Sequence, residues 1–87
     1  MKVQFLNSFE KDLNNVPLPV RHKVVELVGR IEAAVSIRQI EQVKKLRGYK
    51  NAYRIRIGKF RLGLLARGDL VQFVHLLDRK NIYRVFP

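Results

Sequence analysis

The stretch Y-R-I-R-I-G-K-F-R, which runs from Tyr53 to Arg61, decides the fold that this sequence predicts. Apolar and basic residues alternate along its first five positions, and a period of two is typical of a β-strand with one buried face. Gly58 and Lys59 favour a two-residue turn, after which Phe60 begins a return strand. We therefore expect an antiparallel hairpin at the centre of the fold.

The cations of this hairpin are expected on one face of the sheet. The turn pairs Arg56 with Arg61, and cross-strand partners point to the same side. Arg54 shares that side because it lies two residues before Arg56. Like charges directly opposite each other destabilise a sheet, yet the ribbon carries four cations and no acid within eight residues. This pattern predicts a face that binds phosphate; the alternative is a solvated basic surface.

Positive charge is concentrated in the second half of the chain. The 87 residues carry a net charge of +11, with 18 Lys and Arg against 7 Asp and Glu. Residues 1–43 hold six cations and five acids, whereas residues 44–87 hold twelve cations and two acids. Such a half is typical of a protein that meets nucleic acid, an acidic protein or an anionic membrane. The membrane is the least favoured, because the basic half is predicted as strands and not as an amphipathic helix.

The length predicts a single domain that comprises residues 1–87. A chain of this size buries only roughly 60–65% of its unfolded surface, so any site is expected on a sheet surface or in a shallow cleft. No cysteine is present, which excludes disulfides and thiolate chemistry. No apolar run approaches the ~20 residues of a membrane span, and the N-terminus lacks the apolar core of a secretory signal. We expect a soluble cytoplasmic protein.

The first half of the chain predicts one strand and two helices. Residues 2–6 alternate as a short strand. Asn7 and Glu10 have the spacing of a capping box, which predicts a first helix that ends before Pro17. Apolar residues at spacings of three and four then predict a second helix over Pro19–Val35, with its proline in the first turn.

The second helix has two further features, a pair of opposite charges and an internal glycine, and each predicts a contact. Glu26 and Arg30 are four residues apart and favour an ion pair on the exposed face. Gly29 costs roughly 1 kcal/mol relative to alanine inside a helix. Close packing against the sheet or the first helix would explain a glycine at that position.

The second half of the chain predicts strands. Ser36–Leu46 is ambiguous, with a further helical turn followed by an extended basic segment that ends in a turn at Gly48. Three strands are then expected at Ala52–Ile57, Phe60–Ala66 and Leu70–Leu77. The predicted fold class is α+β, in the order β-α-α-β-β-β: the N-terminal strand and a two-helix hairpin pack on one face of a mainly antiparallel four-stranded sheet.

Metal and cofactor chemistry is not predicted. The two histidines, His22 and His75, lie within a predicted helix and a predicted apolar strand, with no acids at ligand spacing. A structural role for His75 is the favoured interpretation. Ser8 and Ser36 are typical of helix boundaries, and no glycine-rich phosphate loop is present. We expect no metal ion and no cofactor.

RNA cleavage without a metal ion needs a base, an acid and cations that stabilise the charge on phosphorus. Arginine supplies only the last function, because it does not deprotonate. Tyrosine and lysine can move protons, and neighbouring positive charge lowers the pKa of either group. Tyr83 and Lys59 are therefore candidates for proton transfer. An aromatic residue such as Tyr83 can alternatively stack on a base without proton chemistry.

At this point the chain resembles the RelE/ParE superfamily of small bacterial toxins, which belong to type II toxin–antitoxin pairs. The resemblance covers essentially the whole length. Three segments carry it in order: K-K-L-R-G at Lys44–Gly48, Y-R-I-R-I-G-K-F-R at Tyr53–Arg61, and D-R-K-N-I-Y-R at Asp78–Arg84. The last is similar to the family's closing His-Arg-Lys-Asp-Val-Tyr-Arg. The resemblance implies a RelE-like messenger-RNA endoribonuclease (mRNA interferase) that needs no metal and acts in the ribosomal A site.

The resemblance also implies a site and partners. Catalytic roles are expected for three residues: Arg61, Arg79 and Tyr83. Binding of RNA phosphate is expected from the other basic residues around them: Lys44, Lys45, Arg54, Arg56, Lys59 and Arg84. Two positions depart from the family, because Arg54 and Arg56 are lysine in some active members, and Asp78 replaces a common basic residue or histidine. The implied partners are messenger RNA, the ribosome and an acidic or amphipathic antitoxin that folds on binding.

Two alternatives stay open from the sequence. The ParE branch shares the scaffold but inhibits DNA gyrase without nuclease activity, and fold-level similarity does not separate the branches. A RelE-like module that binds nucleic acid and has lost toxicity is the other. Arg61, Arg79 and Tyr83 favour the nuclease.

Overall fold

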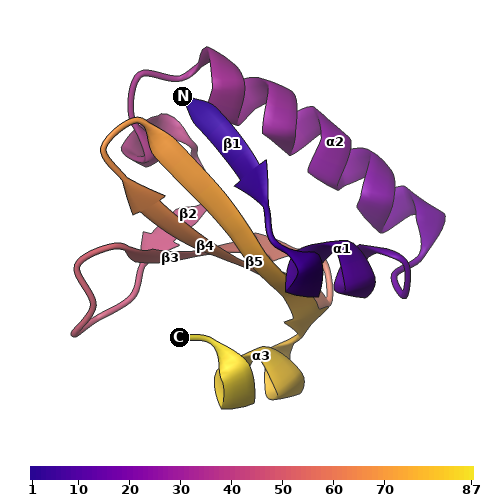
Figure 1. Cartoon of the computed structure of the whole chain (residues 1–87). Coiled ribbons are helices and arrows are strands. Elements are labelled where there is room, and N and C mark those ends of the chain that lie inside the picture. Colours follow the sequence, from indigo (N-terminus) through magenta and orange to yellow (C-terminus); the bar gives the residue numbers. More distant parts are fainter.

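The computed structural model describes all residues from 1 to 87. A five-stranded sheet forms its centre, in the spatial order β1-β5-β4-β3-β2 (Figure 1). β1 pairs with β5 in parallel, and the other neighbours are antiparallel. The strands are β1 (Lys2–Phe5), β2 (Val43–Lys45), β3 (Ala52–Ile57), β4 (Phe60–Arg67) and β5 (Leu70–Asp78).

The α+β class is confirmed, but the predicted count of four strands is wrong by one. The additional strand is β2, which belongs to the extended basic segment that the sequence predicted without a pairing partner. Lys44 lies opposite Arg54 and Lys45 opposite Tyr53. A strand of only three residues gives too short an alternation to be recognised before its partner is known.

The central hairpin has the predicted register. β3 covers the predicted residues, Arg56 pairs with Arg61, and Ile57 pairs with Phe60. Gly58 adopts a φ of 58° in the turn, a left-handed conformation that favours glycine. Side chains of β3 alternate as expected, since Ile55 and Ile57 are buried while Arg56 is exposed.

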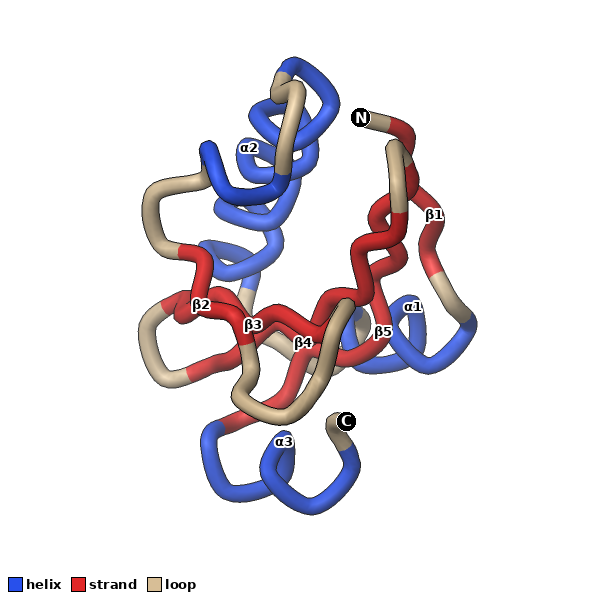
Figure 2. Tube along the Cα trace, turned by 90° about the vertical axis from the view of Figure 1, so that its left-hand side faces the viewer, coloured by secondary structure: helices blue, strands red, loops and turns tan.

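Two helices precede the hairpin. α1 (Asn7–Leu13) contacts β5, and α2 (Leu18–Ala33) lies along one face of the sheet (Figure 2). Pro19 occupies the first turn of α2, as predicted. The capping box at Asn7 is wrong: Leu6 precedes the first turn and no side chain caps it. A 3₁₀ turn at Ile37–Gln39 follows α2.

Two expectations for α2 are also wrong: an ion pair between Glu26 and Arg30, and close packing at Gly29. No ion pair joins Glu26 to Arg30. The one ion-pair contact in the structure joins His75 to Asp12. Nothing lies within 4 Å of a Cβ built on Gly29, so close packing does not explain this glycine. Both positions face solvent, where a glycine meets no steric demand and an ion pair gains little.

The main hydrophobic core lies between α1, α2 and the sheet. Its fully buried members include Phe9 of α1, Ile31 of α2, and Leu62, Leu64 and Phe73 of the central strands. Apolar burial on this face is what holds both helices to the sheet. No helix of the structure is both long enough and apolar enough to cross a membrane.

A third helix covers part of the opposite face, which the sequence did not predict. α3 (Arg79–Val85) lies across the sheet from α2 (Figure 2). Asp78 caps it, since its carboxylate accepts a hydrogen bond from the Asn81 backbone N–H at 2.9 Å. Ile82 and Phe86, four residues apart, form a small second core with Ala52. The sequence predicted a last strand that ends at Leu77 and no helix after it, because about two turns are too short to show a helical period.

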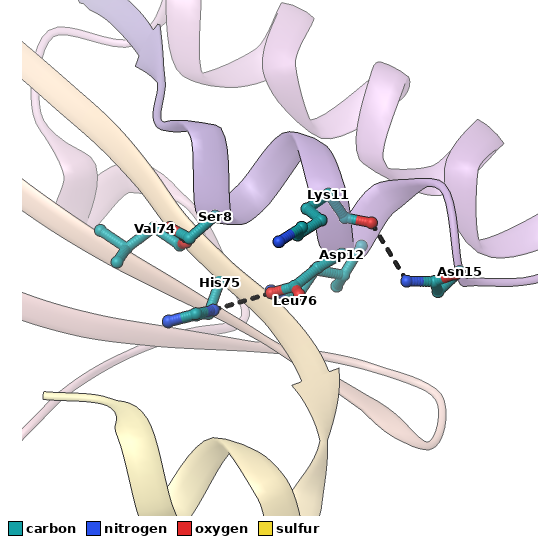
Figure 3. Close-up of polar contacts among 7 residues, drawn as sticks. All are labelled: Ser8, Lys11, Asp12, Asn15, Val74, His75 and Leu76. Carbon is teal, nitrogen blue, oxygen red and sulfur yellow. Dashed lines mark hydrogen bonds and ion pairs between the residues drawn. The ribbon is translucent and has the colours of Figure 1, made fainter.

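β5 contains an irregularity that α1 stabilises (Figure 3). Gly63 pairs with His75 and Leu64 with Phe73, so Val74 is an extra residue. The Ser8 hydroxyl donates to the Val74 carbonyl. The Asp12 carboxylate accepts the Leu76 N–H at 3.0 Å and lies 2.8 Å from Nδ1 of His75. His75 therefore has a structural partner that its sequence neighbours did not reveal.

Candidate functional site

Two rows of polar side chains cross the face of the sheet that α2 leaves open. Lys44 lies opposite Arg54, and Arg56 lies opposite Arg61. Gln42 directly precedes β2 and shares the alternation of Lys44, so it extends the row of Arg56. Strand pairing alone thus gathers residues that are up to 19 positions apart in the sequence.

These rows form the floor of a shallow cleft of about 390 Å³. Seven residues line it: Gln42, Lys44, Arg54, Arg56, Arg61, Arg79 and Tyr83. Five of them are cations, none is an acid, and none of the five forms an ion pair. Unpaired like charges at this density repel one another, so an anion in the cleft would stabilise the folded protein.

α3 supplies the wall of the cleft. Arg79 and Tyr83 lie four residues apart in α3, which places them on one helical face. Ile82 and Phe86 hold the helix on the sheet. The Phe86 ring occupies the space above Gly63, where an added Cβ would lie only 2.7 Å from it. This close packing determines how near α3 comes to the cations.

Tyr83 lies among guanidinium groups. The central guanidinium carbons of Arg54 and Arg79 are 4.8 and 5.8 Å from the centre of its ring. The pKa of Tyr83 is lowered from its ordinary value of 10.0, first by hydrogen bonding from the Arg79 side chain. The positive charges of Arg54, Arg79 and Arg61 lower the pKa further, whereas partial desolvation opposes them.

Arg61 is held in place by the hairpin turn. One of its terminal nitrogens, Nη1, donates to the Gly58 and Phe60 carbonyls, both at 3.0 Å. A guanidinium that is already oriented loses less conformational entropy when an anion binds. The remaining N–H groups of Arg61 stay available to the cleft.

The structure brings six of the nine predicted site residues together and separates three. Lys45 lies opposite Tyr53, whose ring is buried on the α2 side, so Lys45 points away from the cleft. Lys59 occupies the exposed hairpin turn, and Arg84 is exposed on α3; neither lines the cleft. Gln42 lines the cleft but was not predicted. Its position two residues before Lys44 was the available signal, which the ambiguity of the segment concealed.

Proton transfer in the cleft is limited to two types of side chain. The four arginines do not deprotonate, which leaves Tyr83 and Lys44. No group of three or more His, Asp or Glu side chains is arranged to hold a metal ion. The arrangement can therefore hold a phosphate, neutralise charge that develops on it and exchange a proton through a phenol.

Known proteins of similar sequence and structure help to identify the family of the chain. No model of a protein family matches the chain. Over 88 aligned residues, which cover all of both proteins, the chain is 39% identical to Toxin RelE3 of Methanocaldococcus jannaschii. The RelB–RelE antitoxin–toxin complex from Methanococcus jannaschii contains a similar chain, with a TM-score of 0.82 and 36% identity over 95% of this chain and 98% of that one.

More distant structures share the fold. The RelE–RelB complex from Pyrococcus horikoshii OT3 gives a TM-score of 0.74 at 22% identity, over 90% of this chain and 93% of that one. The isolated E. coli RelE toxin gives 0.72 at 18% identity, over 95% and 90% of the two chains. None of these names refers to DNA gyrase, so they give no support to the gyrase alternative.

Proposed function

The chain belongs to the RelE family of toxins, and on that premise we propose that it is a ribosome-dependent messenger-RNA endoribonuclease. One observation carries the proposal: five unpaired cations and a tyrosine line one cleft, and three of the cations, Arg79, Arg54 and Arg61, lower the pKa of the tyrosine. Cations placed around developing phosphate charge, next to a group that can accept a proton, are the parts that metal-free RNA cleavage requires. A protein that only binds another protein does not need a proton acceptor in its basic cleft.

The proposed reaction uses Tyr83 as the base. Its phenolate takes the proton of a 2′-hydroxyl, the 2′-oxygen forms a bond to the adjacent phosphorus, and the bond from phosphorus to the 5′-oxygen breaks. The products are a 2′,3′-cyclic phosphate and a 5′-hydroxyl. Arg61 and Arg79 neutralise the additional charge on phosphorus, and the Lys44 ammonium can donate a proton to the leaving oxygen.

Cleavage in a translating extract tests this proposal. Primer extension on a translated message should show cuts inside codons. With an Arg61→Ala/Tyr83→Ala double variant, the message should show no cuts. Lys45→Ala is the matched control, because that lysine points away from the cleft. Equal cutting by the double variant would show that the site is assigned wrongly. Inhibition of purified gyrase with messages left intact would favour the ParE-like alternative.

The chemistry of the attacking group gives an independent test. A single 2′-deoxy nucleotide at the cut position should abolish cleavage there, because the attacking oxygen is missing, while binding persists. Cleavage of the deoxy-substituted message at the same position would exclude 2′-oxygen attack.

The same cleft supports an antitoxin partner. Relatives of this chain are described in complexes of RelE with RelB, and the cleft contains no acid of its own. We expect the cognate antitoxin to present acidic side chains to these cations and so to exclude RNA. Mixing the two proteins should abolish RNA binding at a one-to-one ratio.

A further inference from the structure

A second hollow adjoins the cationic cleft. It has a volume of about 290 Å³ and is formed by α2 and the β3 end of the hairpin. Gln42 and Arg56 line both spaces, so the two adjoin at these side chains. β2 pairs with β3 only at Tyr53–Ile55. The outer edge of β3 beyond Ile55 therefore has no strand partner to fill this space.

The second hollow differs chemically from the cationic cleft. Leu27, Ile55 and Ile57 contribute apolar surface to it. Its polar side chains carry both signs of charge, since Glu26 lies among basic residues of α2 and β3. An apolar floor with polar groups at its margin suits a flat ring that has hydrogen-bonding edges. Unlike the cationic cleft, it contains a carboxylate that can accept hydrogen bonds from such a ring.

Glu26 is free to accept hydrogen bonds. The ion pair that its spacing to Arg30 predicted is not formed, and no other cation pairs with it. A carboxylate only accepts hydrogen bonds, whereas the Gln42 amide both donates and accepts. The cations of the adjoining cleft only donate. Glu26 in the second hollow and Gln42 at its border with the cleft are thus the lining side chains of the hollow that can accept a ligand N–H.

We propose that this second hollow receives a nucleobase beside the phosphate held in the cationic cleft, and that Glu26 and Gln42 read its edge. The inference rests on the proposed function in taking RNA as the bound anion. Bases of single-stranded RNA expose the edges that are paired in a duplex. Adenine, cytosine and guanine carry an exocyclic amino group that matches these acceptors, and uracil carries none. Uracil offers these acceptors only its single N3–H, so the proposed hollow favours an amino-bearing base over uracil.

Binding of two uncleavable oligonucleotides tests the proposal. One is a 2′-O-methyl hexanucleotide of adenine, and the other contains purine, which stacks similarly but lacks the amino group. Fluorescence anisotropy should show roughly three- to tenfold tighter binding of the adenine oligonucleotide, as expected for one net hydrogen bond. Glu26→Ala and Gln42→Ala should each bring this ratio towards one.

Glu32→Ala is the matched control. It removes the same charge from an exposed position of α2 that does not line either space. This variant should bind both oligonucleotides somewhat more tightly, by relief of repulsion, and keep the wild-type ratio. The ratio of affinities is the readout, since it cancels the general effect of charge.

The outcomes separate this inference from the proposed nuclease. A wild-type ratio of one, or a ratio that neither substitution changes, overturns the base-reading hollow even if messages are cut. A ratio that both substitutions abolish supports the hollow even if no message is cut in the extract. Failure to bind either oligonucleotide overturns the base-reading hollow alone, because the proposed nuclease acts on messages in the ribosome and is tested by cleavage in the extract.

Discussion

Tyr83 is the residue whose titration reports on the state of the cleft. Its pKa is lowered in the folded protein, so at a given pH below 10 it is ionised more often than in the unfolded chain. If the phenolate is the base, the cleavage rate rises with pH and levels off above the lowered pKa. Tyr83→Phe should remove this rise and reduce the rate by roughly 10²- to 10⁴-fold.

The pKa itself can be measured without RNA. The chain has three tyrosines and no tryptophan, so ionisation is visible as phenolate absorbance in the near ultraviolet. A phase of ionisation should appear below the ordinary tyrosine pKa of 10.0, and Tyr83→Phe should abolish that phase. Arg79→Ala should move the phase to higher pH, because Arg79 is the largest cause of the shift. An unchanged titration in Arg79→Ala would contradict the assigned contact.

Lys44 and Lys45 provide a test of geometry at constant charge. Each substitution by alanine removes one cation from β2, but only Lys44 lines the cleft. Lys44→Ala should therefore weaken RNA binding and cleavage by several-fold more than Lys45→Ala does. The assay is cleavage in the translating extract with anisotropy on the same oligonucleotides. Equal losses would mean that overall charge, and not the cleft, determines binding.

At the level of elements, the docking of α3 depends on one glycine. Gly63→Ala places a Cβ against the Phe86 ring, and relief of that overlap displaces the helix that carries Arg79 and Tyr83. We expect a loss of roughly 1–3 kcal/mol in the free energy of unfolding, typical of overpacking, and a rise of the Tyr83 pKa. Thermal unfolding and the tyrosine titration measure these two effects.

Gly29→Ala is the control for this substitution. It lies in α2 with open space around its Cβ position, so alanine should stabilise the helix by about 1 kcal/mol. The Tyr83 titration should not change. A lower free energy of unfolding for Gly63→Ala together with a higher one for Gly29→Ala would confirm that packing at Gly63, and not the loss of a glycine, destabilises the protein.

The elements differ in how well the sequence predicts them. β3 and α2 were found because alternation and helical period extend over enough residues to exceed chance. β2 and α3 were missed as elements because each is stabilised by partners distant in the sequence: β2 by pairing with β3, and α3 by Ile82 and Phe86 on the sheet. The alternation of β3 and the turn after it predicted the shared face of Arg54, Arg56 and Arg61, whereas Lys44 and Arg79 followed only from the family resemblance. Gln42 and the exclusion of Lys45 required the register of β2.

For the whole molecule, the charge distribution predicts how RNA binding depends on salt. The net charge is +11, but only the five cations of the cleft are expected to contact phosphate. For single-stranded RNA the slope of log affinity against log salt is about −0.7 per contact, which gives roughly −3.5 for this protein. Each cleft cation changed to alanine should reduce the slope by about 0.7. A slope near zero would exclude the cleft as a phosphate site.

The pairing of β1 with β5 bears on when the protein becomes active. Lys2–Phe5 find their partners only at Leu70–Phe73, and Arg79 and Tyr83 follow still later. During synthesis the first strand must wait for nearly the whole chain to leave the exit tunnel, because contacts this distant form late. The cleft therefore cannot assemble before Arg79 and Tyr83 have been synthesised. If the protein acts on the ribosome as proposed, this order of assembly would spare the ribosome that is making it.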